Sequence, residues 1–498
     1  MRTSLARLVF PSLRWRRLGG YAHERAKIDA ALKAGVGGFI LFGGTRELVT
    51  ALTRDLRQAA GRPLLIGSDL ERGAAQQVRG LTDMPPPAAL GFVDDLDATH
   101  AAALITAREA RAVGINWNFA PMCDLDLEPR NPIVQTRSFG ADPARVGRHA
   151  AAYVCGSQEH GVLACAKHYP GHGRTTLDSH EALPVVATPL EELRSVDGEP
   201  FARAVRDGVG SVMTAHVAYP AWTAHGRAAT FAPEILGYLR GALGFDGLVV
   251  TDALIMGGAT AEQAEALATV AAGCDALLYP SDFAGVVSAL DAAVGTALPV
   301  ARADEALARY ERAVETWSRG QGAGGRESEL DLAAHEAFAG VIADRALHMV
   351  RGEPPRLHGA LEVTVVDDDA GGRYGVGPRD ILARNLRDAG VRVVPSPSRR
   401  PERSEGAARG ATLKDSLTVA GNVQRIIALY SEPRSWKGRA DLGPRSLRLL
   451  RQLAPRAALV VLFGHPRLAA QIPGSAPVLC AWHGQPLMQR AVARRLTT

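Results

Sequence analysis

The sequence lacks the features of a disulfide-stabilised or membrane-spanning protein. Its five cysteines are odd in number and widely spaced, without a CxxC pair, which predicts buried free thiols in a reducing compartment. No apolar run reaches the roughly 18 residues of a membrane span, and Arg7 and Pro11 interrupt the apolar start of the chain. We therefore expect a cytoplasmic protein without a membrane partner.

The charge distribution argues against nucleic-acid binding. The net charge of +5 comes from scattered arginines, and no basic stripe interleaved with aromatic residues is present. Nucleic acid is therefore not an expected partner. No GxGxxG turn follows the first apolar run, which argues against a dinucleotide-binding sheet. No motif indicates a cofactor, and the oligomeric state stays open. With 47% apolar and 22% charged residues, the composition is that of an ordinary globular enzyme.

Residues 1–320 contain eight short apolar runs that alternate with helix-like segments. Continuous apolar runs suit parallel strands buried on both faces, and their alternation with helices predicts right-handed βα units. Eight such units in about 300 residues fit a TIM-like (β/α)8 barrel better than an open doubly wound sheet. The runs are Leu8–Phe10, Gly38–Phe42, Leu64–Ser68, Ile115–Ala120, Leu163–Ala166, Ser211–Ala215, Leu248–Thr251 and Ala276–Tyr279, and the helix-like segments are His23–Ala34, Glu47–Ala60, Ala98–Val113, Ala144–His160, Leu190–Arg206, Pro233–Leu243 and Ala261–Ala272.

The remainder of the chain predicts a smaller three-layer α/β domain. We expect the barrel over residues 1–320, a Gly-rich linker over 321–330 and the second domain over 331–498. A low-complexity segment at 395–414 predicts a mobile loop. The expected strands are Leu361–Val366, Val391–Val394, Arg425–Tyr430 and Ala458–Phe463, and the expected helices are Ile381–Ala389, Ser446–Leu453 and a terminal helix from Pro486.

One stretch, Ala164–Pro184, carries an unusual density of ionisable side chains. Small apolar residues that suit a strand end lead into Lys167-His168-Tyr169-Pro170-Gly171-His172-Gly173. Two glycines and a proline in four positions force a loop, which ends on Asp178-Ser179-His180. An Asp that binds one imidazole nitrogen raises the basicity of the other. Asp178 and His180 are therefore a candidate proton donor and acceptor near neutral pH.

Polar residues also follow the other apolar runs, at the rim where the carboxyl ends of barrel strands meet. Asp252 comes directly after Leu248–Thr251, so a strand holds its carboxylate at the mouth as a nucleophile, a metal ligand or a structural cap. His172 is expected to brace its loop, and Glu71 with Arg72 can form a rim ion pair. In chain order, the polar residues after the third to seventh runs are Asp69, Asp124 and Arg137, Lys167 and His168, His216 and Asp252.

The stretch from Lys167 to Gly173, followed by Asp178-Ser179-His180, resembles the signature of family-three glycoside hydrolases of the β-N-acetylglucosaminidase branch. Arg137–Gly140, Met213–His216 and Thr251–Leu254 extend the resemblance over the barrel. It implies that Asp252 is the nucleophile of a retaining glycosidase and that His180, oriented by Asp178, is the general acid/base. It also implies that the sugar is bound, without a metal, by Asp69, Arg137, Lys167, His168 and His216.

The function implied is an exo-β-N-acetylglucosaminidase that acts on peptidoglycan-derived fragments, with a carbohydrate as its partner. The sequence departs from the family at Glu71-Arg72-Gly73-Ala74, where a Glu-Gly-Gly-Arg-like turn is common, and at Tyr169, where Phe is usual. Alternatives within the family are a β-glucosidase and a glycoside phosphorylase.

Two alternatives come from other classes. A metal-dependent barrel hydrolase could use His168, His172, His180 and Asp252 as ligands, but no H-x-H follows the first strand. A sugar-binding protein on a catalytically retired barrel is the non-enzymatic alternative. Asp252, Asp178 and His180 are all present, so the sequence gives no sign of such decay.

Overall fold

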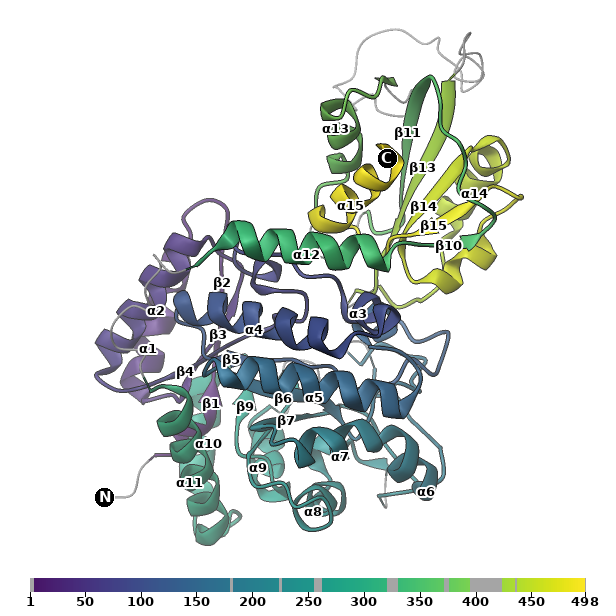
Figure 1. The fold of residues 1–498 in the computed structure, drawn as a ribbon. Coiled ribbons are helices and arrows are strands. Elements are labelled where there is room, and N and C mark those ends of the chain that lie inside the picture. The colour runs from purple at the N-terminus through teal and green to yellow at the C-terminus, as the bar shows by residue number, and fades with distance from the viewer. Residues whose placement is uncertain are drawn as a thin grey trace, which may run out of the picture. The chain divides into compact units, whose positions relative to one another are not determined.

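The computed structural model shows two compact units, Met1–Ala339 and Gly340–Thr498 (Figure 1). It describes residues 4–179, 182–223, 226–254, 262–319, 330–370, 376–394, 423–434 and 437–497. The predicted linker, apart from Leu330, and the whole predicted mobile loop at 395–414 lie outside these ranges.

The first unit is a barrel of parallel strands surrounded by helices, which confirms the predicted fold class (Figure 1). Seven strands, β2 to β8, pair in chain order. β9 pairs with β1 and meets β8 through a bridge between Val250 and Ala276, so strand contacts run around the full circle. The strands are β1 (Val9–Phe10), β2 (Ser12–Arg14), β3 (Gly38–Phe42), β4 (Leu65–Ser68), β5 (Trp117–Asn118), β6 (Leu163–Tyr169), β7 (Ser211–Thr214), β8 (Leu248–Val250) and β9 (Leu277–Leu278).

All eight predicted runs form strands, and the first one extends further than predicted. Pro11 divides it into β1 and β2 because proline has no N–H to donate to a sheet. Its carbonyl still accepts the N–H of Ile40 at 3.1 Å. The chain therefore continues along the same side of β3 to Arg14, four residues beyond the predicted end.

The predicted helices occur at the expected places, with one exception. The segment Leu190–Arg206, predicted as a single helix, instead forms α6, a π-helical turn at Leu193–Asp197 and then α7. Pro200 lies in the first turn of α7, where its missing N–H is tolerated. The helices of this unit are α1 (Arg25–Ala34), α2 (Arg46–Ala60), α3 (Pro87–Val93), α4 (Leu96–Ala112), α5 (Pro143–Glu159), α6 (Leu190–Glu192), α7 (Glu199–Arg206), α8 (Pro233–Gly241), α9 (Glu262–Ala272), α10 (Phe283–Ala293), α11 (Val300–Trp317) and α12 (Leu332–Ala346), which continues into the second unit.

Side chains on the barrel strands alternate between the interior and the surrounding helices, as a period of two requires. On β3, Ile40 packs with residues from the other strands, whereas Phe39 and Leu41 pack against helices. On β8, Val250 faces the interior and Val249 faces outward. The interior is filled by large apolar side chains, so the barrel is a packed core and only its carboxyl end can hold a site.

The second unit is a three-layer α/β domain with a six-stranded mixed sheet in the order β10-β15-β14-β13-β11-β12. β10 is antiparallel to β15, and the other pairs are parallel. Helices α13 and α15 lie on one side of the sheet and α14 on the other (Figure 1). The elements are β10 (His348–Arg351), β11 (Ala360–Asp367), α13 (Ile381–Asp388), β12 (Val393–Val394), β13 (Val423–Ser431), α14 (Pro444–Leu453), β14 (Leu459–Gly464), β15 (Val478–Cys480) and α15 (Pro486–Thr497).

All five cysteines are free, but the prediction that they are buried is wrong for Cys155. This residue lies on the solvent-facing side of α5, between Val154, which is buried against the barrel, and Gly156, which packs against α4. In the parts of the chain that the structure describes, no helix is long and apolar enough to span a bilayer.

Glycine at position 38 is required by the close approach of β3 to β4. A Cβ there would lie 1.6 Å from the carbonyl oxygen of Leu65, whereas one on Gly237 of α8 would meet nothing within 4 Å. We expect Gly38→Ala to cost about 3 kcal/mol or more and Gly237→Ala to add roughly 0.5–1 kcal/mol, measured by urea unfolding. A fully stable Gly38→Ala protein would contradict the pairing of β3 with β4.

Candidate active site

Three of the predicted site residues, Asp69, Lys167 and Asp252, lie at the carboxyl end of the barrel, and strand alternation turns them inward. Leu65 and Leu163 face the barrel interior. Asp69 and Lys167, each four residues further along the same chain direction, keep that orientation and meet above the core. Asp252 stands in the same relation to Leu248, which also faces the interior.

A buried carboxylate, Glu71, holds two of the predicted sugar-binding cations. Its two oxygens accept hydrogen bonds from Nε and Nη2 of Arg137 at 3.0 and 2.7 Å, in a bidentate pair. Its Oε1 also lies 2.7 Å from Nζ of Lys167. Lys167 in turn donates to Asp69 at 2.9 Å. Glu71 therefore binds two cations that the suggested rim pair with Arg72 does not include.

The mutual attraction of these charges outweighs the cost of burying them. Burial alone would raise the pKa of Glu71, but Arg137 and Lys167 hold it well below its usual range. Burial would lower the pKa of Lys167, yet Asp69 and Glu71 raise it above its ordinary value. Glu71, Arg137 and Lys167 therefore stay charged across the neutral range, and the two cations keep fixed positions from which to donate to a ligand.

Asp124 organises the beginning of the loop that follows β6. Its carboxylate accepts hydrogen bonds from Nδ1 of His168 at 2.7 Å, from the main-chain N–H of His168 at 3.1 Å and from that of His172 at 2.6 Å. Burial would raise the pKa of this carboxyl, but the neighbouring His168 leads the contacts that lower it below its ordinary value. The bond to Nδ1 orients the His168 ring so that Nε2 faces Asp252.

His172 braces the same loop, as its sequence context predicts. Its Nδ1 lies 2.8 Å from the hydroxyl of Thr175 and its Nε2 3.0 Å from that of Ser179. Desolvation lowers the pKa of His172 to about 4, so the ring is neutral at neutral pH. Asn131 donates to the main-chain oxygen of His172 at 2.9 Å.

Asp252 lies just beyond β8, with 19% of its side chain exposed. Its Oδ1 accepts the N–H of Ala253 at 2.7 Å, and its Oδ2 lies 4.0 Å from Nε2 of His168. The carboxylate is therefore held beside the Asp124–His168 pair while part of it faces the mouth.

The remaining predicted residues have different surroundings. Asp178 is buried, and its carbonyl accepts the N–H of Ala182 at 3.2 Å. His180 lies outside the described residues. His216 follows β7, with Nδ1 at 3.2 Å from the hydroxyl of Thr230 and its ring edge-on to Phe231.

Two important residues were not assigned a role from the sequence. The sequence indicates Asp124 only as a polar residue after the fourth run, and Glu71 only as half of a rim pair. Their position after buried strands was the signal available. Their partners lie 44, 66 and 96 residues away along the chain, so only the folded barrel identifies them.

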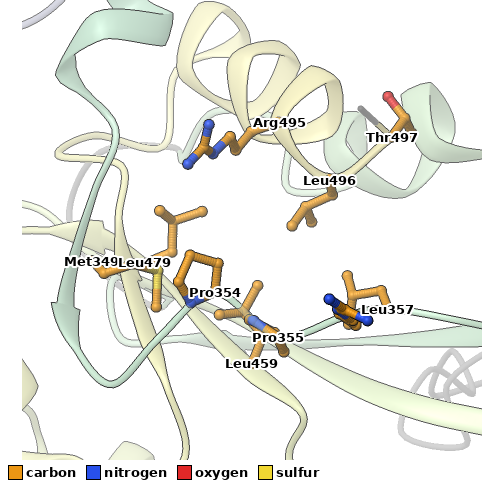
Figure 2. Close-up of a pocket in the computed structure, with 10 residues that line it drawn as sticks. Met349, Pro354, Pro355, Leu357, Leu459, Leu479, Arg495, Leu496 and Thr497 are labelled. Carbon is orange, nitrogen blue, oxygen red and sulfur yellow. The ribbon is translucent and has the colours of Figure 1, made fainter.

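The described residues contain no cluster of three or more His, Cys, Asp or Glu side chains arranged to hold a metal ion. A cavity of about 490 Å³ does exist in the second unit, lined by residues such as Met349, Leu459, Leu479 and Leu496, with Arg495 at its edge (Figure 2). Its lining includes none of the predicted site residues.

Comparison with known proteins identifies the barrel. The model of the N-terminal domain of glycosyl hydrolase family 3 matches residues 3–313. The chain belongs to glycoside hydrolase family 3. A β-N-acetylglucosaminidase/β-glucosidase of Cellulomonas fimi is 33% identical to this family 3 chain over 429 residues, which cover 81% of the chain and 71% of that protein. A β-hexosaminidase of Bordetella avium is 40% identical over 259 residues, 49% of this chain and 73% of its own length.

Solved structures agree with this membership and with the prediction that the chain is a glycosidase. A family 3 β-N-acetylglucosaminidase from a Paenibacillus species superposes with a TM-score of 0.80 at 28% identity, covering 100% of this chain and 97% of that one. A β-glucoside phosphorylase superposes equally well, with a TM-score of 0.80 over 99% of this chain and 91% of that one, but at 21% identity it shows only a common fold.

Removing the Glu71 carboxylate from this family 3 enzyme should leave Arg137 without its carboxylate partner and Lys167 with Asp69 alone. We expect Glu71→Gln to lose about 3–5 kcal/mol of stability at pH 7. Because the pKa of Glu71 is depressed in the folded state, its contribution is complete above the unfolded value and disappears as pH falls. The stability difference between parent and variant should therefore narrow from pH 5 downward.

The matched control is Glu315→Gln on α11, which breaks an exposed pair with Arg319, just beyond the end of that helix. Its cost should stay below about 1 kcal/mol. Denaturant unfolding of the three proteins over a pH series gives the comparison. A Glu71→Gln loss no larger than that of the control would contradict the charge pairing described above.

Proposed function

We propose that this chain is a retaining exo-β-N-acetylglucosaminidase that acts in the cytoplasm on peptidoglycan-derived fragments. The observation that carries the proposal is the position of Asp252. Its carboxylate is part-exposed at the end of a buried strand, 4.0 Å from His168 and beside a layer of buried, charge-paired side chains. The family membership and the Cellulomonas and Bordetella relatives support this substrate class.

In the proposed reaction, Asp252 attacks the anomeric carbon and forms a covalent glycosyl-enzyme while the aglycone departs. Lys167, Arg137, His168, Asp69 and His216 bind the sugar. The pairing of Lys167 and Arg137 with Glu71 supports their role, because fixed charged donors form strong, directional hydrogen bonds to sugar hydroxyls.

His180, oriented by Asp178, donates the proton to the leaving group and then activates water. A histidine in this role becomes neutral once it has given up its proton, so no second anion stands beside Asp252. Such a neutral base also admits phosphate as an acceptor without charge repulsion. Product analysis in phosphate buffer distinguishes release of the free sugar from release of a sugar phosphate.

The nucleophile assignment is tested by Asp252→Asn. The amide cannot form the covalent intermediate, so turnover of an aryl N-acetylglucosaminide should fall by several orders of magnitude while the fold persists. A fluorosugar should label Asp252 in the parent enzyme, as peptide mass mapping can show. Asp55→Asn, on the exposed face of α2, is the control and should keep full activity. A tenth of the parent activity in Asp252→Asn would rule the assignment out.

The acid/base pair is tested by varying the leaving group. We expect His180→Ala to slow hydrolysis strongly when the leaving group is a sugar, which needs protonation, and far less for glycosylation with an activated aryl group. Asp178→Ala should give a weaker version of this pattern because the imidazole survives without its orienting partner. Equal losses on both substrates, measured as kcat/KM, would leave His180 as a binding residue only.

A further inference from the structure

The carboxyl end of the barrel interior contains one cation to which the proposed function gives no role. Arg14 is the last residue of β2, and its Cα pairs in register with that of Phe42 on β3. Leu13, the residue before it, packs outward against α1. Arg14 therefore faces inward, in the layer above the apolar core that also contains Asp69, Lys167 and Asp252.

Two aromatic rings hold the guanidinium of Arg14 in place. Its Nε donates to the hydroxyl of Tyr279 at 2.7 Å. Its central carbon lies 4.4 Å from the ring centre of Phe42 and 5.2 Å from that of Tyr279. The centres of these two rings lie 5.6 Å apart, so the rings are themselves in contact. Stacking fixes the plane of the guanidinium but leaves the terminal nitrogens available at its edge.

The order of the strands places this group close to the proposed sugar pocket. Around the barrel, Asp252 follows β8, Tyr279 follows β9, Arg14 ends β2, Phe42 ends β3 and Asp69 follows β4. Neighbouring strands lie about 4.8 Å apart, so the backbone of Arg14 is on the order of 10 Å from those of Asp69 and Asp252. A disaccharide bound between Asp69 and Asp252 would therefore lie within reach of the Arg14 side chain.

Arg14 differs from the other two cations described at this mouth in its pairing. Lys167 and Arg137 are bound by Asp69 and Glu71. Glu24 accepts the main-chain N–H of Arg14 and forms no ion pair with its guanidinium. The second oxygen of Glu24 lies 2.7 Å from Nζ of Lys27. Among the described residues, no carboxylate forms an ion pair with the Arg14 guanidinium. A half-buried cation without an anion is costly, and a ligand oxyanion would remove that cost.

We propose that Arg14, fixed by Phe42 and Tyr279, is an oxyanion-binding residue beside the sugar pocket. This inference rests on the proposed function, because it takes the pocket between Asp69 and Asp252 to be the sugar site. The planar fork of arginine suits a two-oxygen contact with a carboxylate or a phosphate. The oxyanion is either a carboxylate on the aglycone sugar or free inorganic phosphate, and the two sources call for separate measurements.

The first measurement compares aglycones that differ only in charge. The substrates are an N-acetylglucosaminyl disaccharide whose reducing sugar bears an O-lactyl carboxylate, and its methyl ester. We expect the parent enzyme to favour the acid, and Arg14→Gln to reduce kcat/KM on the acid by about 10- to 100-fold more than on the ester. Arg14→Lys, which keeps the charge without the fork, should retain part of the preference.

The second measurement uses inorganic phosphate and does not need turnover. Phosphate should raise the melting temperature of the full-length parent more than chloride does at equal ionic strength, and Arg14→Gln should lose that difference. Arg79→Gln is the control for both measurements, because Arg79 also stacks on an aromatic ring, 4.6 Å from the centre of Trp15, but is exposed. It should respond to acid, ester and phosphate as the parent does.

The outcomes separate the two sources. Loss of the acid preference in Arg14→Gln assigns the site to the aglycone, and loss of the phosphate response assigns it to free phosphate. If Arg14→Gln alters neither the acid-to-ester ratio nor the phosphate response, the proposal is overturned. A parent enzyme that does not hydrolyse any N-acetylglucosaminide would refute the proposed function instead, while the melting measurement would still test Arg14.

Discussion

The inward and outward alternation of the barrel strands is the constraint on which the whole site depends. Because successive side chains point to opposite faces, an apolar core residue such as Leu163 or Leu248 fixes the direction of the residue four positions later. Lys167 and Asp252 reach the mouth for this reason alone. The loops after the strands then add contacts, but they do not choose which strand-end residues face the interior.

A second constraint follows from the first, because polar groups forced into a packed interior need partners. Glu71 compensates Arg137 and Lys167, and Asp124 compensates His168 while it fixes two main-chain N–H groups of the loop. Such pairing makes the layer rigid, since each member is held by at least two contacts. Rigidity is what a sugar site requires when its donors must be positioned before the ligand arrives.

The sequence predicted the parts of this arrangement that local patterns encode. The eight apolar runs predicted the strands, and the polar residues after them predicted the rim. Partners far apart in the chain could not be predicted, because the Glu71–Arg137 pair joins loops that follow different strands. The strands β10 and β15 were not predicted either. The exposed Cys155 could not be predicted because its exposure depends on which side of α5 faces the barrel. The roles of the site residues and the domain boundaries stay predictions.

The shared carboxylate of Glu71 has an evolutionary consequence. One acidic residue pairs with two basic ones, so the three positions cannot vary independently. Loss of Glu71 removes the carboxylate partner of Arg137 and leaves Lys167 with Asp69 alone, and loss of either cation leaves the buried acid with a single ionic partner. A substitution at any one of these three positions is therefore destabilising unless a second position changes with it. Across homologous chains, positions 71, 137 and 167 should therefore be inherited together as a single unit.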